Sequence, residues 1–184
     1  MSPLRIGVSG FKSSGKDSIA ANLIARHNFR RLALADPMKE MLHVGLGIPL
    51  DVLHGSPEAK EAPWRYGKSP RQLLQTLGTE WGREMVSDRL WLDLALERTI
   101  PAWEAKHGPT SWVLPDVRFP NEAKVLREHG FTIWRINRPG CTGDGHASET
   151  EMDGIIADYT LTNDDTLDSL YRQVDILLSF MDPR

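Results

Sequence analysis

The sequence is poor in the features that mark secreted, membrane-spanning and polynucleotide-binding proteins. Cys141 is the single cysteine, so no internal disulfide can form, and this fits a reducing cytosol. Lys12 and Lys16 interrupt the only N-terminal stretch that resembles a secretory leader, and no apolar run is long enough to cross a bilayer. The formal net charge of −3 offers no broad basic surface for a polynucleotide. We therefore expect a soluble, cytoplasmic protein without polynucleotide or membrane partners.

What the sequence does contain is an alternation of short apolar segments with segments of helical periodicity. At 184 residues, with 40% hydrophobic and 26% charged residues, the chain is long enough for one globular domain. The expected strands cover residues 4–9, 29–33, 112–114, 132–136 and 158–162. The expected helices cover 16–27, 71–83, 88–106, 121–128 and 166–180, with a further helix after the cap Asp36-Pro37. This order predicts a three-layer α/β/α fold around a mainly parallel, five-stranded sheet.

Residues 10–18 carry the strongest functional signal. The segment Gly10-Phe11-Lys12-Ser13-Ser14-Gly15-Lys16 matches the G-x-x-x-x-G-K pattern of phosphate-binding loops and lies between an expected strand and an expected helix. Glycines permit close approach, backbone N–H groups surround phosphate oxygens, and Lys16 reaches the outer phosphates as a catalytic group. The guanine signature N-K-x-D is absent. We therefore predict ATP binding by Gly10, Lys12, Ser13, Ser14, Gly15, Lys16, Asp17 and Ser18.

Asp17 stands where this pattern normally has the serine or threonine that binds magnesium. A carboxylate is also a hard oxygen ligand, so we expect Asp17 to bind Mg²⁺, while Ser18 could provide a hydroxyl instead. The alternative interpretation of the whole segment is a glycine-rich turn that contains a lysine by chance.

A second group of polar residues follows the strand expected at 112–114. Asp116 and Arg118 come directly after it, at the edge of an open α/β sheet where ligands usually bind. Asp116 could orient a substrate group or contact magnesium, and Arg118 could pair with a phosphate in two hydrogen bonds. Asn121 and Glu122 follow at a helix start, where capping and ligand binding are both open.

The chain resembles the phage deoxynucleoside monophosphate kinases over most of its length. Six segments carry the resemblance in order: Ser9–Ser18, Leu34–Lys39, Arg71–Thr79, Asp116–Glu122, Arg138-Pro139-Gly140 and Thr162–Leu167. The resemblance implies one P-loop kinase domain over residues 1–184, with substrate-binding helices at about 45–107 and a lid-like loop at about 138–154. It also implies that Asp17 is a family trait rather than a damaged motif.

The resemblance further implies roles for residues outside the loop. On the acceptor side, Arg71 and Arg83 could contact phosphate, Gln75 a base edge and Trp81 a base face, although Trp81 could equally belong to the core. Arg138 could act on the transferred phosphate from the lid. Asn163 falls near the expected adenine position, where residues 164–166 could instead be only a helix cap.

The resulting hypothesis is ATP- and Mg²⁺-dependent phosphorylation of a deoxynucleoside monophosphate to the diphosphate, supplying phage DNA synthesis in the host cytoplasm. Phosphomevalonate kinase, another small phosphate-acceptor kinase, or a kinase acting on hydroxymethylated bases in DNA are enzymatic alternatives. A regulatory module that binds nucleotide without turnover is a non-enzymatic one. A monomer and a homodimer are both compatible with the sequence.

Overall fold

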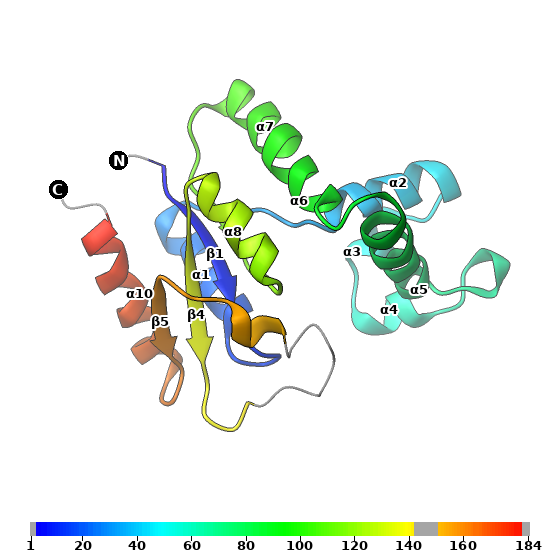
Figure 1. Cartoon of the computed structure of the whole chain (residues 1–184). Coiled ribbons are helices and arrows are strands. Elements are labelled where there is room, and N and C mark those ends of the chain that lie inside the picture. The colour runs from blue at the N-terminus through cyan, green and yellow to red at the C-terminus, as the bar shows by residue number, and fades with distance from the viewer. Residues whose placement is uncertain (1–2, 142–150, 182–184) are drawn as a thin grey trace. The chain divides into compact units, whose positions relative to one another are not determined.

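The computed structural model describes residues 3–141 and 151–181 (Figure 1). The chain divides into two compact units, one made of residues 1–32 and 103–184 and the other of residues 33–102. The first unit contains the whole sheet, and the second contains only helical elements. The lid-like loop expected at 138–154 lies partly outside the described residues, since 142–150 are not among them.

The sheet of the first unit has five strands, all parallel, in the order β2-β3-β1-β4-β5. Their bounds are Arg5–Ser9 (β1), Arg30–Arg31 (β2), Trp112–Leu114 (β3), Phe131–Asn137 (β4) and Tyr159–Thr162 (β5). Each strand lies at the expected place in the chain, which confirms the α/β prediction. The second strand is shorter than the expected 29–33, because only Arg30 and Arg31 pair with β3.

Helices cover both faces of this sheet. Ile6 and Val8 of β1 point to the face packed by α1 (Lys16–His27) and α10 (Leu167–Met181), where they join one apolar cluster. Gly7 points to the opposite face, where a Cβ atom would meet Ile133 and the Leu126 side chain of α8 (Pro120–Glu128). Alternate residues of one strand therefore serve two helical layers, as a buried parallel strand requires.

The second unit begins with α2 (Asp36–Leu46) and continues through three short helical turns. These are α3 (Leu50–His54), α4 (Pro57–Glu61) and the 3-10 turn η1 (Arg65–Gly67), in the stretch that the sequence leaves irregular. Leu42, Ile48 and Leu53 form the buried centre of this part. Asp36 is the first helical residue rather than the cap, because Ala35 occupies the cap position and Pro37 lies in the first turn.

The helix expected at 71–83 is present but changes its winding. It starts as α5 (Pro70–Gln75), where Ser69 and Gln72 form a capping box, and continues as the π-helix η2 (Thr76–Val86). The next expected helix is divided into α6 (Leu90–Leu94), the π-helical η3 (Ala95–Thr99) and α7 (Ile100–His107). Sequence periodicity alone does not distinguish 3.6 residues per turn from this wider winding.

Trp91 of α6 packs against η2 and so connects the two helices. Its indole Nε1 donates to the Gly78 carbonyl at 2.8 Å, and its ring packs against Gly82, where a Cβ would lie 2.5 Å from the ring. Trp91 is 5% exposed, so its contacts are those of a core residue. Among the described residues, no helix is long and apolar enough to span a membrane.

Candidate functional site

The loop between β1 and α1 has the backbone shape of a phosphate cradle. Gly10, Ser13 and Gly15 have positive φ values of 148°, 63° and 112°. A Cβ on Gly10 would lie 2.7 Å from the Ile136 carbonyl oxygen, so this position has no room for a side chain. The glycines of the motif are therefore required by backbone geometry and close packing, as the sequence indicated.

The side chain of Lys16 lies back over the loop that precedes it. Its Nζ donates to the carbonyl oxygens of Gly10 at 2.5 Å and Phe11 at 2.9 Å. Lys16 also begins α1, whose N-cap is Gly15 without a side-chain cap. The first N–H groups of a helix and a lysine ammonium thus converge on one end of α1, which is the chemistry that binds phosphate.

A cleft of about 470 Å³ opens at this loop. Its lining consists of Ser13, Gly15, Lys16, Asp17, Ser18, Arg138, Asn163, Asp165 and Leu167. The tertiary structure thus brings Arg138 and Asn163, which are distant in sequence, to the predicted ATP site. Gly10, Lys12 and Ser14 do not line the cleft, and Ser14 is buried.

Two side chains from the ends of neighbouring strands bind consecutive carbonyl groups of the loop. Arg138, just after β4, donates to the Ser13 carbonyl oxygen at 3.0 Å. Asn163, just after β5, donates through Nδ2 to the Ser14 carbonyl oxygen at 2.8 Å. Both residues therefore contact protein atoms of the loop in addition to facing the cleft.

Asp17, the predicted magnesium ligand, is one of two aspartates that line the cleft, the other being Asp165. The Asp17 side chain is 84% exposed, and one oxygen lies 3.5 Å from the Nη2 of Arg31 at the end of β2. No group of three or more histidine, cysteine or acidic side chains among the described residues could hold a metal ion by itself. One carboxylate beside a phosphate-binding loop fits Mg²⁺, which commonly takes one or two carboxylates together with substrate phosphates.

Asp116 and Arg118 lie beside the same end of the sheet. The backbone N–H of Val117 donates to the Val8 carbonyl at 3.0 Å, which holds this segment next to the end of β1. Arg118 Nη2 and Nε lie 2.7 and 2.8 Å from one Asp116 oxygen, with both side chains about half exposed. Glu122 accepts from the N–H groups of Arg118 and Phe119, so it caps α8. The predicted phosphate ligand and the predicted metal ligand thus form an ion pair with each other.

The four predicted acceptor-side residues belong to the second unit. Arg71 and Gln75 lie one helical turn apart on α5 and are exposed, and Arg71 pairs with Glu61 at 2.6 Å. Trp81 is 39% exposed, with its ring centroid 6.1 Å from that of Trp91, so the ring is partly free. Arg83 is half-buried on η2. The four residues lie in one stretch of the unit because α5 and η2 follow each other directly along the chain.

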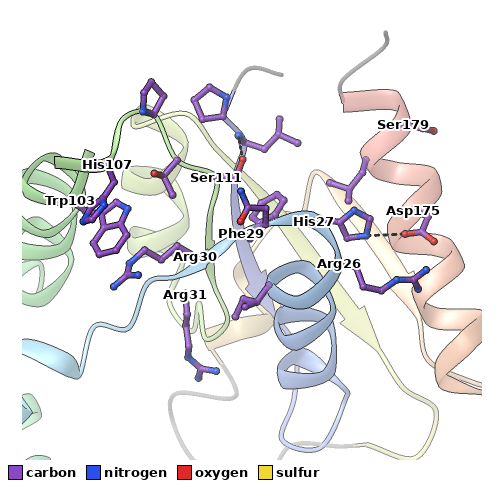
Figure 2. A pocket seen from close by; sticks show the side chains of 17 residues that line it. Arg26, His27, Phe29, Arg30, Arg31, Trp103, His107, Ser111, Asp175 and Ser179 are labelled. Atoms are coloured by element: carbon purple, nitrogen blue, oxygen red, sulfur yellow. Dashed lines mark hydrogen bonds and ion pairs between the residues drawn. The ribbon is translucent and has the colours of Figure 1, made fainter. Parts of the chain in front are cut away.

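A larger hollow of about 1380 Å³ lies at the other end of the sheet, around the amino ends of its strands (Figure 2). Several of its polar side chains have structural partners. Arg30 lies 3.3 Å from the centroid of the Trp103 ring, and His27 of α1 pairs with Asp175 of α10 at 2.9 Å. Figure 2 shows Arg31 pointing away from Trp103, as alternation along β2 requires. This hollow is separate from the cleft at the phosphate-binding loop, since the two share no lining residue.

Arg31, which pairs with Asp17 beside the phosphate-binding loop, is a residue that sequence reasoning missed. It occupies the end of an expected strand, and the carboxyl ends of parallel strands meet at one edge. That rule, applied to residues 29–33 as it was to Asp116, would have identified Arg31 as a candidate.

Comparisons with known proteins agree with this geometry. A family model described as deoxynucleotide monophosphate kinase matches residues 58–174. A deoxynucleotide monophosphate kinase homologue of Acanthamoeba polyphaga mimivirus is 33% identical over 189 residues, covering 92% of this chain and 93% of that protein. The deoxynucleoside-5'-monophosphate kinase of Escherichia phage T5 is 52% identical over 60 residues, which are 33% of this chain and 22% of that protein.

A solved structure supports the fold. Shikimate kinase from Aquifex aeolicus superimposes with a TM-score of 0.51 at 14% identity, covering 97% of this chain and 96% of that one. At this identity the likeness concerns the arrangement of helices and strands alone, and it agrees with a P-loop kinase fold.

Proposed function

Because the chain belongs to the deoxynucleotide monophosphate kinase family, we propose that it transfers the terminal phosphoryl group of ATP to a deoxynucleoside monophosphate. The observation that carries this proposal is the cleft at residues 13–18, where a lysine, an arginine and the start of α1 face one space. Family membership supports a deoxynucleoside monophosphate as the acceptor, and the cleft supports binding of the donor phosphates at the loop.

The reaction needs little covalent chemistry from the protein. An oxygen of the acceptor phosphate bonds to the γ-phosphorus while the bond from that phosphorus to the bridging oxygen of ADP breaks. The acceptor is already anionic, so no strong base is needed, and the main barrier is the repulsion between two charged molecules. Lys16 and Arg138 line the cleft and place positive charge there.

Mg²⁺ fits the same site, with Asp17 as the carboxylate that would hold it. When bound, the ion offsets negative charge on the phosphate oxygens during transfer. Arg31 lies next to this proposed ligand, with its Nη2 3.5 Å from one Asp17 oxygen. We propose Asp116 as a second, outer ligand through water and Arg118 as a contact to the transferred phosphate.

For the acceptor we propose the helices of the region 45–107, with Arg71 and Arg83 near the phosphate and Gln75 and Trp81 near the base. The support is chemical: Arg71 and Gln75 share one exposed side of α5, and Trp81 keeps 39% of its surface exposed. An exposed ring and an amide next to guanidinium groups suit a nucleotide better than mevalonate phosphate. Bringing two anions together also explains why the proposed donor and acceptor residues include several arginines in a chain of net charge −3.

The test is to incubate the full chain with ATP, Mg²⁺ and each deoxynucleoside monophosphate in turn, and to measure the diphosphate formed. A panel that includes phosphomevalonate separates the proposed acceptor from the nearest alternative. Lys16→Ala should lower kcat by about 10²- to 10³-fold, because it removes the positive charge nearest the loop. Lys124→Ala, at an exposed position of α8, is the matched control and should keep the wild-type rate. If no nucleotide is phosphorylated, or if Lys16→Ala retains the wild-type rate, the proposal is wrong.

A further inference from the structure

Asn163 is buried and hydrogen-bonded to the phosphate-binding loop. A residue that recognises the adenine base would need neither property. Asn163 is 8% exposed, and its amide donates to the Ser14 carbonyl oxygen at 2.8 Å across 149 positions of sequence. A Cβ on Gly15 would lie 2.7 Å from the same Nδ2 atom. The amide of Asn163 therefore packs directly on the Ser14–Gly15 peptide.

The backbone around Asn163 is held on two sides. Its own N–H donates to the Asn137 carbonyl oxygen at 2.7 Å, which extends the pairing of β4 with β5 by one residue. On the outer side, Gln173 of α10 accepts from the Thr162 N–H at 3.0 Å and donates to the Thr162 carbonyl at 2.8 Å. Gln173 thus occupies both backbone groups of Thr162 at the edge of the sheet. These hydrogen bonds fix the backbone of Asn163, so its side chain can hold the loop in one position.

The hydrogen bond from Asn163 also determines the direction of a donor in the loop. A trans peptide is planar, so its C=O and N–H point in opposite directions. With the Ser14 carbonyl directed at Asn163, the Gly15 N–H is directed away from Asn163. Gly15 lines the cleft, and backbone N–H groups at such glycines are the donors that surround phosphate oxygens.

From these contacts we propose that Asn163 is a positioning residue, which fixes the Ser14–Gly15 peptide for phosphate binding and does not select the adenine base. The inference rests on the proposed function insofar as the loop binds the phosphates of a nucleotide. In this role Asn163 affects how tightly the phosphate groups of the ligand are bound. An amide that recognised the base would affect ATP and leave a ligand without a base unchanged.

The test compares the binding of two ligands, Mg-ATP and Mg-tripolyphosphate, by isothermal titration calorimetry on the full chain. Asn163→Ala removes the donor and leaves the Ser14 carbonyl without its partner, so we expect both affinities to fall by about tenfold or more and by similar factors. The preference for ATP over GTP should stay as in the wild type. Asn163→Asp retains the shape and places an acceptor against the carbonyl, and it serves if the alanine variant does not fold.

Asp175→Asn is the matched control for a general loosening of the structure. It weakens the pair between Asp175, near the middle of α10, and His27, the last residue of α1, at the opposite end of that helix from the loop. We expect this variant to lower the melting temperature while both affinities stay unchanged. The proposal is overturned if Asn163→Ala weakens ATP but not tripolyphosphate, if it weakens neither, or if Asp175→Asn weakens both equally. Since binding is measured without an acceptor, absence of turnover with deoxynucleoside monophosphates would contradict the proposed function and leave this result interpretable.

Discussion

Replacing Gly10 by alanine tests whether the shape of the phosphate-binding loop, rather than its sequence motif, determines nucleotide binding. The new Cβ would lie 2.7 Å from the Ile136 carbonyl oxygen and 2.8 Å from the Ser14 hydroxyl. Ile136 belongs to β4, which pairs with β1 on one side and β5 on the other, so its carbonyl cannot withdraw. The loop itself must move.

The size of the effect follows from two costs. The φ of 148° at Gly10 is one that residues with a Cβ rarely adopt, and such a conformation costs about 1–3 kcal/mol. Overlap with fixed neighbours costs a further 1–3 kcal/mol or so in a packed site. A loop that moves to avoid these costs no longer presents its N–H groups to phosphate. We therefore expect the Kd for ATP to rise by at least about tenfold, with a moderate loss of stability.

Gly130→Ala is the matched control. Gly130 has a φ of 79°, and a Cβ added to it would have no atom within 4 Å, so alanine there costs backbone strain alone. That strain is about 1–2 kcal/mol, which corresponds to a melting temperature lower by roughly 2–8 °C for a chain of this size. Calorimetric titration with ATP and thermal unfolding should show a loss of stability in both variants and a loss of affinity only in Gly10→Ala. Wild-type affinity in Gly10→Ala would refute the reasoning.

Two further predictions concern the helical unit. Arg71→Ala should raise the KM for the deoxynucleoside monophosphate about tenfold and lower the free energy of unfolding by less than about 1 kcal/mol, since its pair with Glu61 is exposed. Arg89→Ala breaks the comparable pair with Asp93 and should leave KM unchanged; an equal rise in both variants would contradict a role for Arg71. Gly82→Ala should lower the free energy of unfolding by about 1–3 kcal/mol, because its Cβ would lie 2.5 Å from Trp91. Gly45→Ala, with no neighbouring atom within 4 Å, should raise it by about 0.5–1 kcal/mol, and denaturant titrations that show equal stabilities would argue against this packing.

Much of the fold could be predicted because its signals are local. Strands β1, β3, β4 and β5 and the helices α1, α8 and α10 lie where apolar periodicity placed them, and Thr166 caps α10 through a hydrogen bond to the Ser169 N–H. The helical turns after α2 could not be predicted, because helices as short as α3 and α4 show no apolar periodicity in the sequence. The π-helical winding of η2 was not foreseen, since the contact between Gly82 and Trp91 that accompanies it joins separate segments.

The sequence by itself determined the phosphate-binding loop, because the positive φ values of Gly10 and Gly15 depend on the local absence of a Cβ. It also determined the order of strands and helices, and thereby the class of fold. Only the tertiary structure decided which distant residues meet that loop. The parallel order β2-β3-β1-β4-β5 brings Arg31 to Asp17 and Asn163 to Ser14. Those pairings depend on strand neighbours and not on spacing along the chain, so the contact of Asn163 with the loop exists only once the sheet is assembled.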